Sequence, residues 1–147
     1  MKLVKKDISE KDGEGFVIVI PEEPEDLYHV YNLITIGDIL TATTLRKVKQ
    51  ESSSGSVKQE KKKLVLSLKI SKISFEPEEC NIRVTGKIVK ENKFVTLGSF
   101  HTIELEINRK LTISKPSWDL IYLERLKIAT DLTERAEQGR LDPVIGR

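Results

Sequence analysis

The sequence predicts a mainly β fold with added α-helices: a small, curved β-barrel with one helix across an opening and a C-terminal helix. Alternating apolar residues and tight turns recur from residue 64 onward, which is typical of antiparallel strands. The alternation slips by one residue between Ile70 and Ile73, and this slip predicts a β-bulge and therefore strong curvature. Two other segments carry apolar residues at helical spacing.

Composition limits the chain to one domain, or one domain plus a tail. It has 147 residues, of which 38% are hydrophobic and 33% charged, enough for a packed core and a solvated surface. The longest apolar runs are too short to span a bilayer, and the N-terminus shows no secretory signal. The single Cys80 excludes an internal disulfide and a multi-cysteine zinc site. We expect a cytoplasmic protein with no membrane partner.

The first half of the chain predicts two short strands, a helix and a long strand. The strands are Lys2–Lys6 and Gly15–Ile20, joined by a turn at residues 11–13. The helix is Pro24–Ile34, whose apolar face is formed by Leu27, Val30, Tyr31 and Ile34. Residues 38–50 are rich in threonine and branched side chains and read as extended. A flexible loop of serines and one glycine follows at Ser52–Ser56.

The second half predicts further strands and a closing helix. Leu64, Leu66, Leu68 and Ile70 alternate along one inward face. Strands are then expected at Ile82–Val89 and Phe94–Leu97, along the face shared by His101, Ile103, Leu105 and Ile107, and at Leu111–Ser114. The segment Pro116–Ala129 predicts a helix with Trp118, Tyr122 and Leu126 along one buried stripe.

Positive charge is concentrated in one part of a nearly neutral chain. The formal net charge is +2, but residues 46–63 contain seven lysines and arginines against two glutamates. A hairpin with basic arms and a serine-rich tip could bind RNA phosphates, or its lysines could only aid solubility, and charge alone favours neither interpretation. The candidate RNA-binding residues are Arg46, Lys47, Lys49, Ser52, Ser53, Ser54, Gly55, Ser56, Lys58, Lys61, Lys62 and Lys63.

Motifs for catalysis are lacking, so we expect no catalytic residues, no cofactor and no resident metal. His29 and His101 have no histidine partner at metal-binding spacing. We expect His29 to be a solvated surface residue and His101 to be partly buried and hydrogen-bonded. One alternative remains. The carboxylates Glu22, Glu23, Glu25 and Asp26 could collect divalent cations and act as a metal-dependent RNA endonuclease. The competing interpretation is an acidic helix start that favours the helix dipole.

Five ordered segments together resemble the first domain of the Pelota family. They are M-K-L-V-K-K-D at residues 1–7, P-E-E-P-E-D-L-Y-H-V-Y-N-L at 21–33, L-R-K-V-K-Q-E-S-S-S-G-S at 45–56, G-S-F-H-T-I-E-L-E at 98–106 and K-P-S-W-D at 115–119. The similarity extends over about residues 1–130, with each motif weak alone and the ordered set specific.

The resemblance implies both a fold and a function. Pelota proteins are multidomain relatives of translation termination factors that enter stalled ribosomes with a translational GTPase and promote subunit dissociation. The family's first domain is an Sm-like β-barrel, and its basic hairpin reaches the decoding centre and the mRNA channel. In this sequence, the resemblance assigns that hairpin contact to Arg46, Lys47, Lys49, Ser52–Ser56 and Lys58. The implied partners are the small ribosomal subunit with its rRNA, mRNA and the GTPase, and the endonuclease activity claimed for the family is disputed.

The last segment departs from that pattern. Leu132–Arg147 resembles the sequence that enters the first ATPase module of Clp-type AAA+ unfoldases, but no Walker A loop follows, so it implies no ATPase. Residues 131–147 are therefore interpreted as a Clp-like tail or linker, arising from a chimera, a gene-prediction error or a cloning junction. Residues 131–138 read as a polar helix with Gly139 as its stop.

Overall fold

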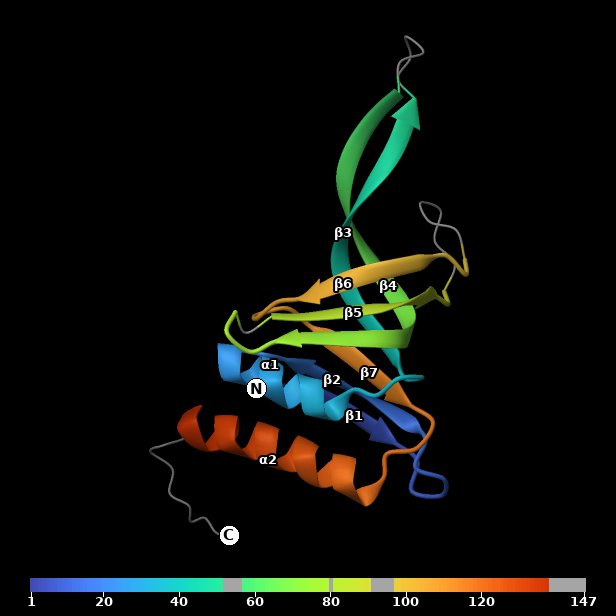
Figure 1. Ribbon diagram of the computed structural model, residues 1–147. Coiled ribbons are helices and arrows are strands. Elements are labelled where there is room, and N and C mark those ends of the chain that lie inside the picture. Colours follow the sequence, from blue (N-terminus) through green and yellow to red (C-terminus); the bar gives the residue numbers. More distant parts are fainter. Residues whose placement is uncertain (52–56, 80, 91–96, 138–147) are drawn as a thin grey trace.

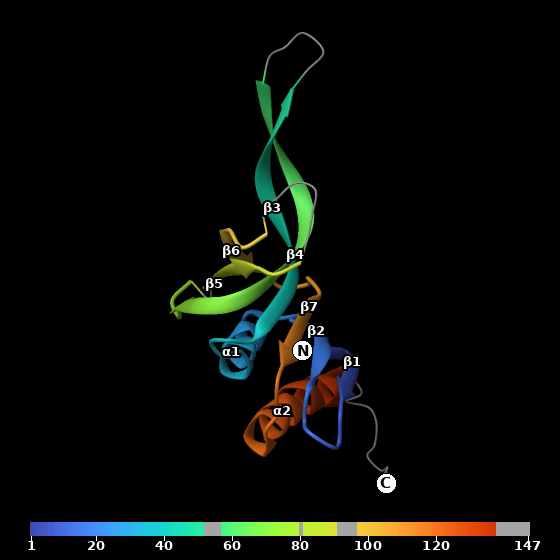
Figure 2. The same cartoon turned by 90° about the vertical axis from the view of Figure 1, so that its right-hand side faces the viewer.

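A long two-stranded hairpin dominates the computed structural model and projects from a body made of a curved sheet and two helices (Figures 1 and 2). The structure describes residues 1–51, 57–79, 81–90 and 97–137, with side chains described for 1–44, 63–79, 81–90 and 97–130. The predicted Phe94–Leu97 strand lies largely outside these residues, as does Cys80. No helix in this part of the chain is long and apolar enough to cross a membrane.

One antiparallel sheet contains the seven strands of the described residues. The strands are β1 (Lys2–Ile8), β2 (Gly15–Ile20), β3 (Ile39–Glu51), β4 (Val57–Glu76), β5 (Asn81–Ile88), β6 (Phe100–Leu105) and β7 (Leu111–Lys115). Their order is β1-β2-β7-β3-β4-β5-β6, so the last strand returns between β2 and β3. The predicted class, mainly β with two helices, is confirmed.

Curvature in the sheet comes from irregular pairing, as the slipped alternation predicts. The β4–β5 register shifts between Ile70 and Lys72, and the β1–β2 register shifts between Leu3 and Lys5. The bend brings β6 back toward β3, where Thr44 and His101 are bonded through side chains. Pairing among the described residues nevertheless leaves β1 and β6 as edges, so the sheet is open and the expected barrel is not closed.

Helix α1 (Pro24–Leu33) covers one side of the sheet. Acidic residues occupy its first turn, where they complement the helix dipole, and Leu27, Val30 and Leu33 are buried. Tyr31, predicted on the buried face, is 38% exposed because Leu33 and the following Ile34 complete that face instead. The Tyr31 ring stacks on Phe75 of β4, with ring centroids 4.8 Å apart.

Helix α2 (Leu120–Glu137) packs at the end of the body opposite the hairpin (Figure 1). It begins after Trp118, which was predicted inside the helix, because the Asp119 carbonyl accepts the backbone N–H groups of Tyr122 and Leu123 and so starts the first turn. Trp118 is still buried, and its indole N–H donates to the Gly15 carbonyl at 2.9 Å. The helix continues past residue 130, so the two predicted helical segments form one helix.

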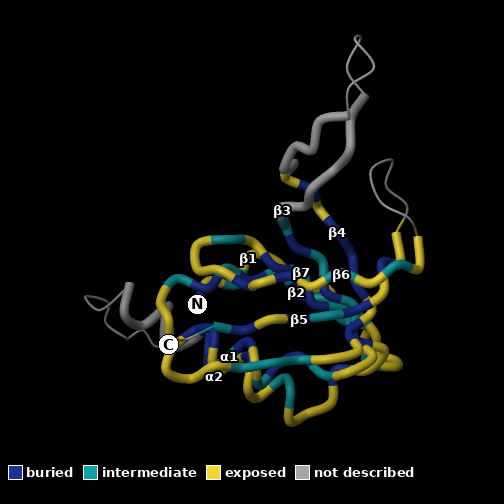
Figure 3. The backbone as a smooth tube through the Cα atoms, turned by 45° about the horizontal axis from the view of Figure 1, so that its top comes forward, coloured by how far each residue is buried: buried dark blue, intermediate teal, exposed yellow. Residues whose placement is uncertain are grey.

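The buried core lies in the body, between the sheet and the two helices (Figure 3). Its most completely buried large side chains include Leu33, Leu40, Leu68, Ile82 and Ile113, which come from α1 and four strands. The sheet, both helices and the start of the hairpin therefore share one core.

Candidate nucleic-acid interface

The hairpin of β3 and β4 places two pairs of the predicted basic residues opposite each other in the backbone register. Its ladder runs continuously from Ile39 opposite Lys69 to Glu51 opposite Val57. Arg46 lies opposite Lys62, and Lys47 lies opposite Lys61. Positions directly opposite each other in an antiparallel pair share a face of the ribbon, and like charges placed there are unfavourable for folding. The backbone ladder therefore brings positively charged residues together, and this arrangement is unfavourable for folding.

The foot of the hairpin is fixed in the core. Leu64, Leu66 and Leu68 are 6%, 1% and 0% exposed, whereas Val65 between them is 63% exposed. This alternation confirms the predicted inward face of β4. The hydroxyls of Thr41 and Ser67 form a hydrogen bond of 2.7 Å between the two strands. Since the basic arms continue these anchored strands, their backbone is positioned by the core.

Only part of the predicted site can be placed. Lys63 is exposed where β4 emerges from the body. Ser52–Ser56, the predicted tip, lies outside the described residues, as do the side chains of the other basic residues on both arms. Their contacts with RNA stay a prediction.

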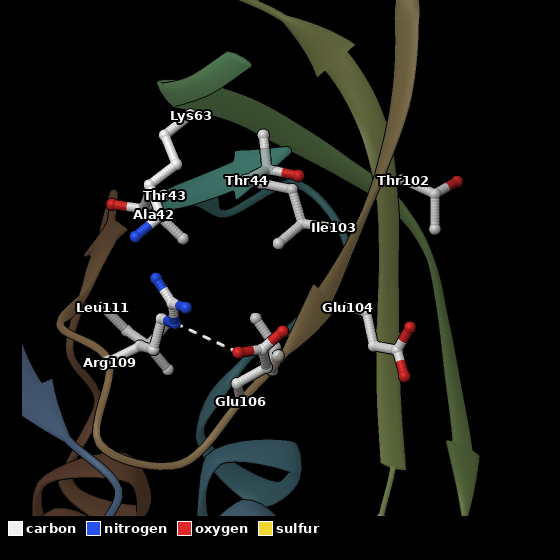
Figure 4. Close-up of a pocket in the computed structure, with 11 residues that line it drawn as sticks. Ala42, Thr43, Thr44, Lys63, Thr102, Ile103, Glu104, Glu106, Arg109 and Leu111 are labelled. Atoms are coloured by element: carbon white, nitrogen blue, oxygen red, sulfur yellow. Dashed lines mark hydrogen bonds and ion pairs between the residues drawn. The ribbon is translucent and has the colours of Figure 1, made fainter. Parts of the chain in front are cut away.

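A pocket of about 250 Å³ lies at the foot of the hairpin, between β3, β6 and the start of β7 (Figure 4). Lys63, Thr43 and Thr44 line one side, and Arg109 lines another. The Arg109 Nε atom donates to a Glu106 carboxylate oxygen at 3.0 Å, so this cation already has a partner. Sequence reasoning missed Arg109 because it follows β6, far from the basic cluster along the chain.

His101 lies in the same gap between β6 and β3. Its Nε2 atom is 3.1 Å from the Thr44 hydroxyl, and its side chain is partly buried. This contact agrees with the prediction of a satisfied histidine. His29, predicted to be a solvated surface residue, is instead half-buried, with its ring edge-on to Tyr28 at 6.1 Å between centroids.

The acidic segment considered as an alternative catalytic site forms the start of α1. One Asp26 carboxylate oxygen accepts the backbone N–H groups of Glu22 and Glu23 at 2.8 and 3.0 Å. The same oxygen lies 3.1 Å from the ammonium group of Met1, whose side chain is buried. Glu23 and Glu25 are exposed beside this cap. Asp26 is therefore occupied in fixing the helix start.

Electrostatics at Asp26 favour its charged form. Burial raises its pKa, but the Glu22 N–H, the Met1 ammonium and the Glu23 N–H together outweigh burial and hold the pKa below the ordinary value of 3.8. No group of three or more histidine, cysteine, aspartate or glutamate side chains suited to a metal ion occurs in the described part of the chain. The geometry here is that of a helix cap.

A buried ion pair near the start of β3 also escaped sequence reasoning. The Lys115 ammonium donates to the Asp38 carboxylate and, at 3.2 Å, to the Thr35 hydroxyl. It also lies 4.0 Å from the centroid of the Tyr122 ring. The available signal was the alternation of Leu111, Ile113 and Lys115, which places the lysine on the inward face of β7.

Comparison with known proteins gives a family match over the body and the hairpin together. The model of the Pelota N-terminal domain matches residues 1–130. The chain is 50% identical over 131 residues to the protein pelota homolog of Bos taurus, covering 89% of this chain and 34% of that protein. It therefore spans about a third of the length of the curated relatives that it matches.

Solved structures support the same fold. A structure described as a model of ribosome-bound archaeal Pelota and ABCE1 is 38% identical with a TM-score of 0.66, covering 88% of this chain and 36% of that chain. The Dom34 protein of S. cerevisiae, described as a translation termination-like factor interacting with Hbs1, has a TM-score of 0.69 at 18% identity, covering 93% and 35% of the two chains.

Proposed function

This chain belongs to the Pelota family through its N-terminal domain, and from that premise we propose that it is the RNA-binding module of a ribosome-rescue factor. In this proposal the β3–β4 hairpin contacts the decoding site of stalled ribosomes in the cytoplasm. The small-subunit rRNA and the mRNA are its direct partners. A translational GTPase is the partner of the longer protein.

One observation carries the proposal: the backbone register of a projecting hairpin, whose foot is anchored in the core, pairs Arg46 with Lys62 and Lys47 with Lys61. Like charges in register oppose folding of the isolated chain. A polyanion relieves this repulsion, because each phosphate neutralises a cation and releases counterions. Relief of the like-charge repulsion thus adds to the favourable free energy of RNA binding. The relative described as ribosome-bound supports a ribosomal partner.

The metal-dependent endonuclease gains no support from the geometry of Glu22, Glu23, Glu25 and Asp26. Two-metal hydrolysis needs carboxylates that converge on an open site. Asp26 instead accepts two backbone N–H groups and faces an ammonium group. In an assay with Mg²⁺ or Mn²⁺, any RNA cleavage by the purified chain should be equal for the wild type and the Glu23→Gln/Asp26→Asn variant. Cleavage abolished only in the variant would revive this alternative.

Chemical probing of rRNA on small ribosomal subunits tests the proposed contact. Bound wild-type chain should protect bases of the decoding site, because the hairpin would occupy that site. The Arg46→Ala/Lys47→Ala/Lys49→Ala variant should lose this protection. The matched control is Lys6→Ala/Lys110→Ala/Lys127→Ala, which removes the same charge from exposed positions on the body.

The control should protect the same bases as the wild type. Protection confined to other parts of the subunit, or equal loss in both triple variants, would contradict the proposed contact.

A further inference from the structure

A second surface involves α1, whose start lies beside the turn between β4 and β5 (Figure 1). It joins an open groove to a group of exposed aromatic rings. We propose that this surface, here named the α1 groove, binds an extended protein segment rich in arginine and lysine.

The groove is lined by both apolar and acidic residues. It encloses about 450 Å³, with Pro24, Leu27 and Ile107 among its apolar lining residues. Glu79, Glu104 and Glu106 also line it, and the described lining contains no lysine or arginine. The apolar residues can pack against the aliphatic stems of long basic side chains. The carboxylates can accept hydrogen bonds from the charged ends of those side chains.

Exposed aromatic rings lie on the same helix, α1. Tyr28 is 53% exposed and Tyr31 is 38% exposed, and both rings pack on Phe75 with centroids 6.0 and 4.8 Å away. Tyr28 directly follows Leu27, which lines the groove. Asn81, another lining residue, lies opposite Glu76 in the β4–β5 ladder, and Glu76 follows Phe75. The rings and the groove are therefore carried by the same two parts of the fold, α1 and the β4–β5 hairpin.

Exposed tyrosines beside carboxylates favour cationic partners. A guanidinium or ammonium group can lie over a tyrosine face and bond to a neighbouring carboxylate at the same time. Nearby cations reduce the negative charge only in part: Arg109 is bonded to Glu106, and Arg83 lies opposite Glu104. Glu25, Glu76 and Glu79 are exposed around the groove. Negative charge of this density repels RNA phosphates, so the rings are unsuited to stacking bases.

Fluorescence anisotropy with a fluorescein-labelled peptide of repeated Arg-Leu-Lys units tests the proposal. Tyr28→Ala/Tyr31→Ala and Glu79→Gln/Glu104→Gln should each weaken peptide binding by roughly tenfold, through loss of cation–π contacts or of charge. The matched control is Glu10→Gln/Glu14→Gln, which removes the same charge from exposed positions near the β1–β2 turn. It should change binding by less than about twofold, because screening limits distant charges.

Every outcome of this experiment bears on the proposal. The glutamine variants keep side-chain shape, so their loss of binding cannot be attributed to a packing defect. Equal loss in the control, or unchanged binding in both groove variants, overturns the proposal. So does loss of single-stranded oligouridine binding in the tyrosine variant, which would assign the surface to RNA. The Arg46→Ala/Lys47→Ala/Lys49→Ala variant should retain peptide binding, so this test is independent of the proposed ribosomal contact.

Discussion

Single buried charges hold the two ends of α1 in place. At its start, Asp26 accepts two backbone N–H groups and faces the Met1 ammonium. Just beyond its end, Asp38 accepts the Thr35 N–H at 2.9 Å and the Lys115 ammonium. Both aspartates are buried, so each carboxylate depends on its partners for compensation.

Asp26 should make folding stability depend on acid pH. Because its pKa is lowered in the folded chain, its contribution is fully present above the ordinary pKa of 3.8 and disappears as pH falls through the lower folded pKa. Asp26→Asn should lower the free energy of unfolding at pH 7 by about 1–3 kcal/mol and by much less at pH 2. Urea denaturation at several pH values checks this. An equal loss at both pH values would contradict a role for the charge.

Lys115 should be among the most sensitive residues of the fold. Lys115→Met leaves the Asp38 carboxylate buried without its cation, which should cost about 3–5 kcal/mol. The Lys115→Met/Asp38→Asn double variant should lose less stability than the sum of the two single variants, since no charge is then stranded. Denaturant titration of all three variants checks the coupling. Simple additivity would show that the pair does not act as a unit.

Among the elements, β4 has two roles, because its second half lies in the core and its first half forms one arm of the hairpin. Leu64, Leu66 and Leu68 of this stretch are buried, and the register shift near Ile70 then bends the strand. Because one continuous strand passes from the core into the projecting arm, the position of the hairpin depends on the packing of the core.

The register of β4 predicts opposite effects for adjacent residues. Leu66→Ala should destabilise the fold by about 2–5 kcal/mol, because a cavity replaces a fully buried side chain. Val65→Ala should change stability by less than about 0.5 kcal/mol, because Val65 is exposed. A chemical-denaturation series measures both. The reverse ranking would mean that the register of β4 is displaced by one residue.

For the molecule as a whole, local sequence patterns predicted the helices and strands, but they did not predict the long-range contacts. Alternation alone located the inward face of β4 and the bulge. Tyr31 was misassigned because it borders the apolar stripe, whereas Leu33 and Ile34 complete the buried face and the Tyr31 ring stacks on Phe75 instead. The Lys115–Asp38 pair depends on β7 lying between β2 and β3, and nothing local in the sequence encodes that order. The same limit applies to the α1 groove, which combines residues from α1, the β4–β5 turn and the end of β6.

In the proposed function the whole molecule divides into a basic hairpin that binds RNA and a body that supports the hairpin. The salt dependence of binding to small ribosomal subunits measures this division directly. For the wild type, the logarithm of the binding constant should fall linearly with the logarithm of salt concentration. The Arg46→Ala/Lys47→Ala/Lys49→Ala variant should bind more weakly, with a slope shallower by about one for each phosphate that the variant no longer neutralises. The Lys6→Ala/Lys110→Ala/Lys127→Ala control should keep the wild-type slope, whereas equal slopes for the wild type and the hairpin variant would contradict the account.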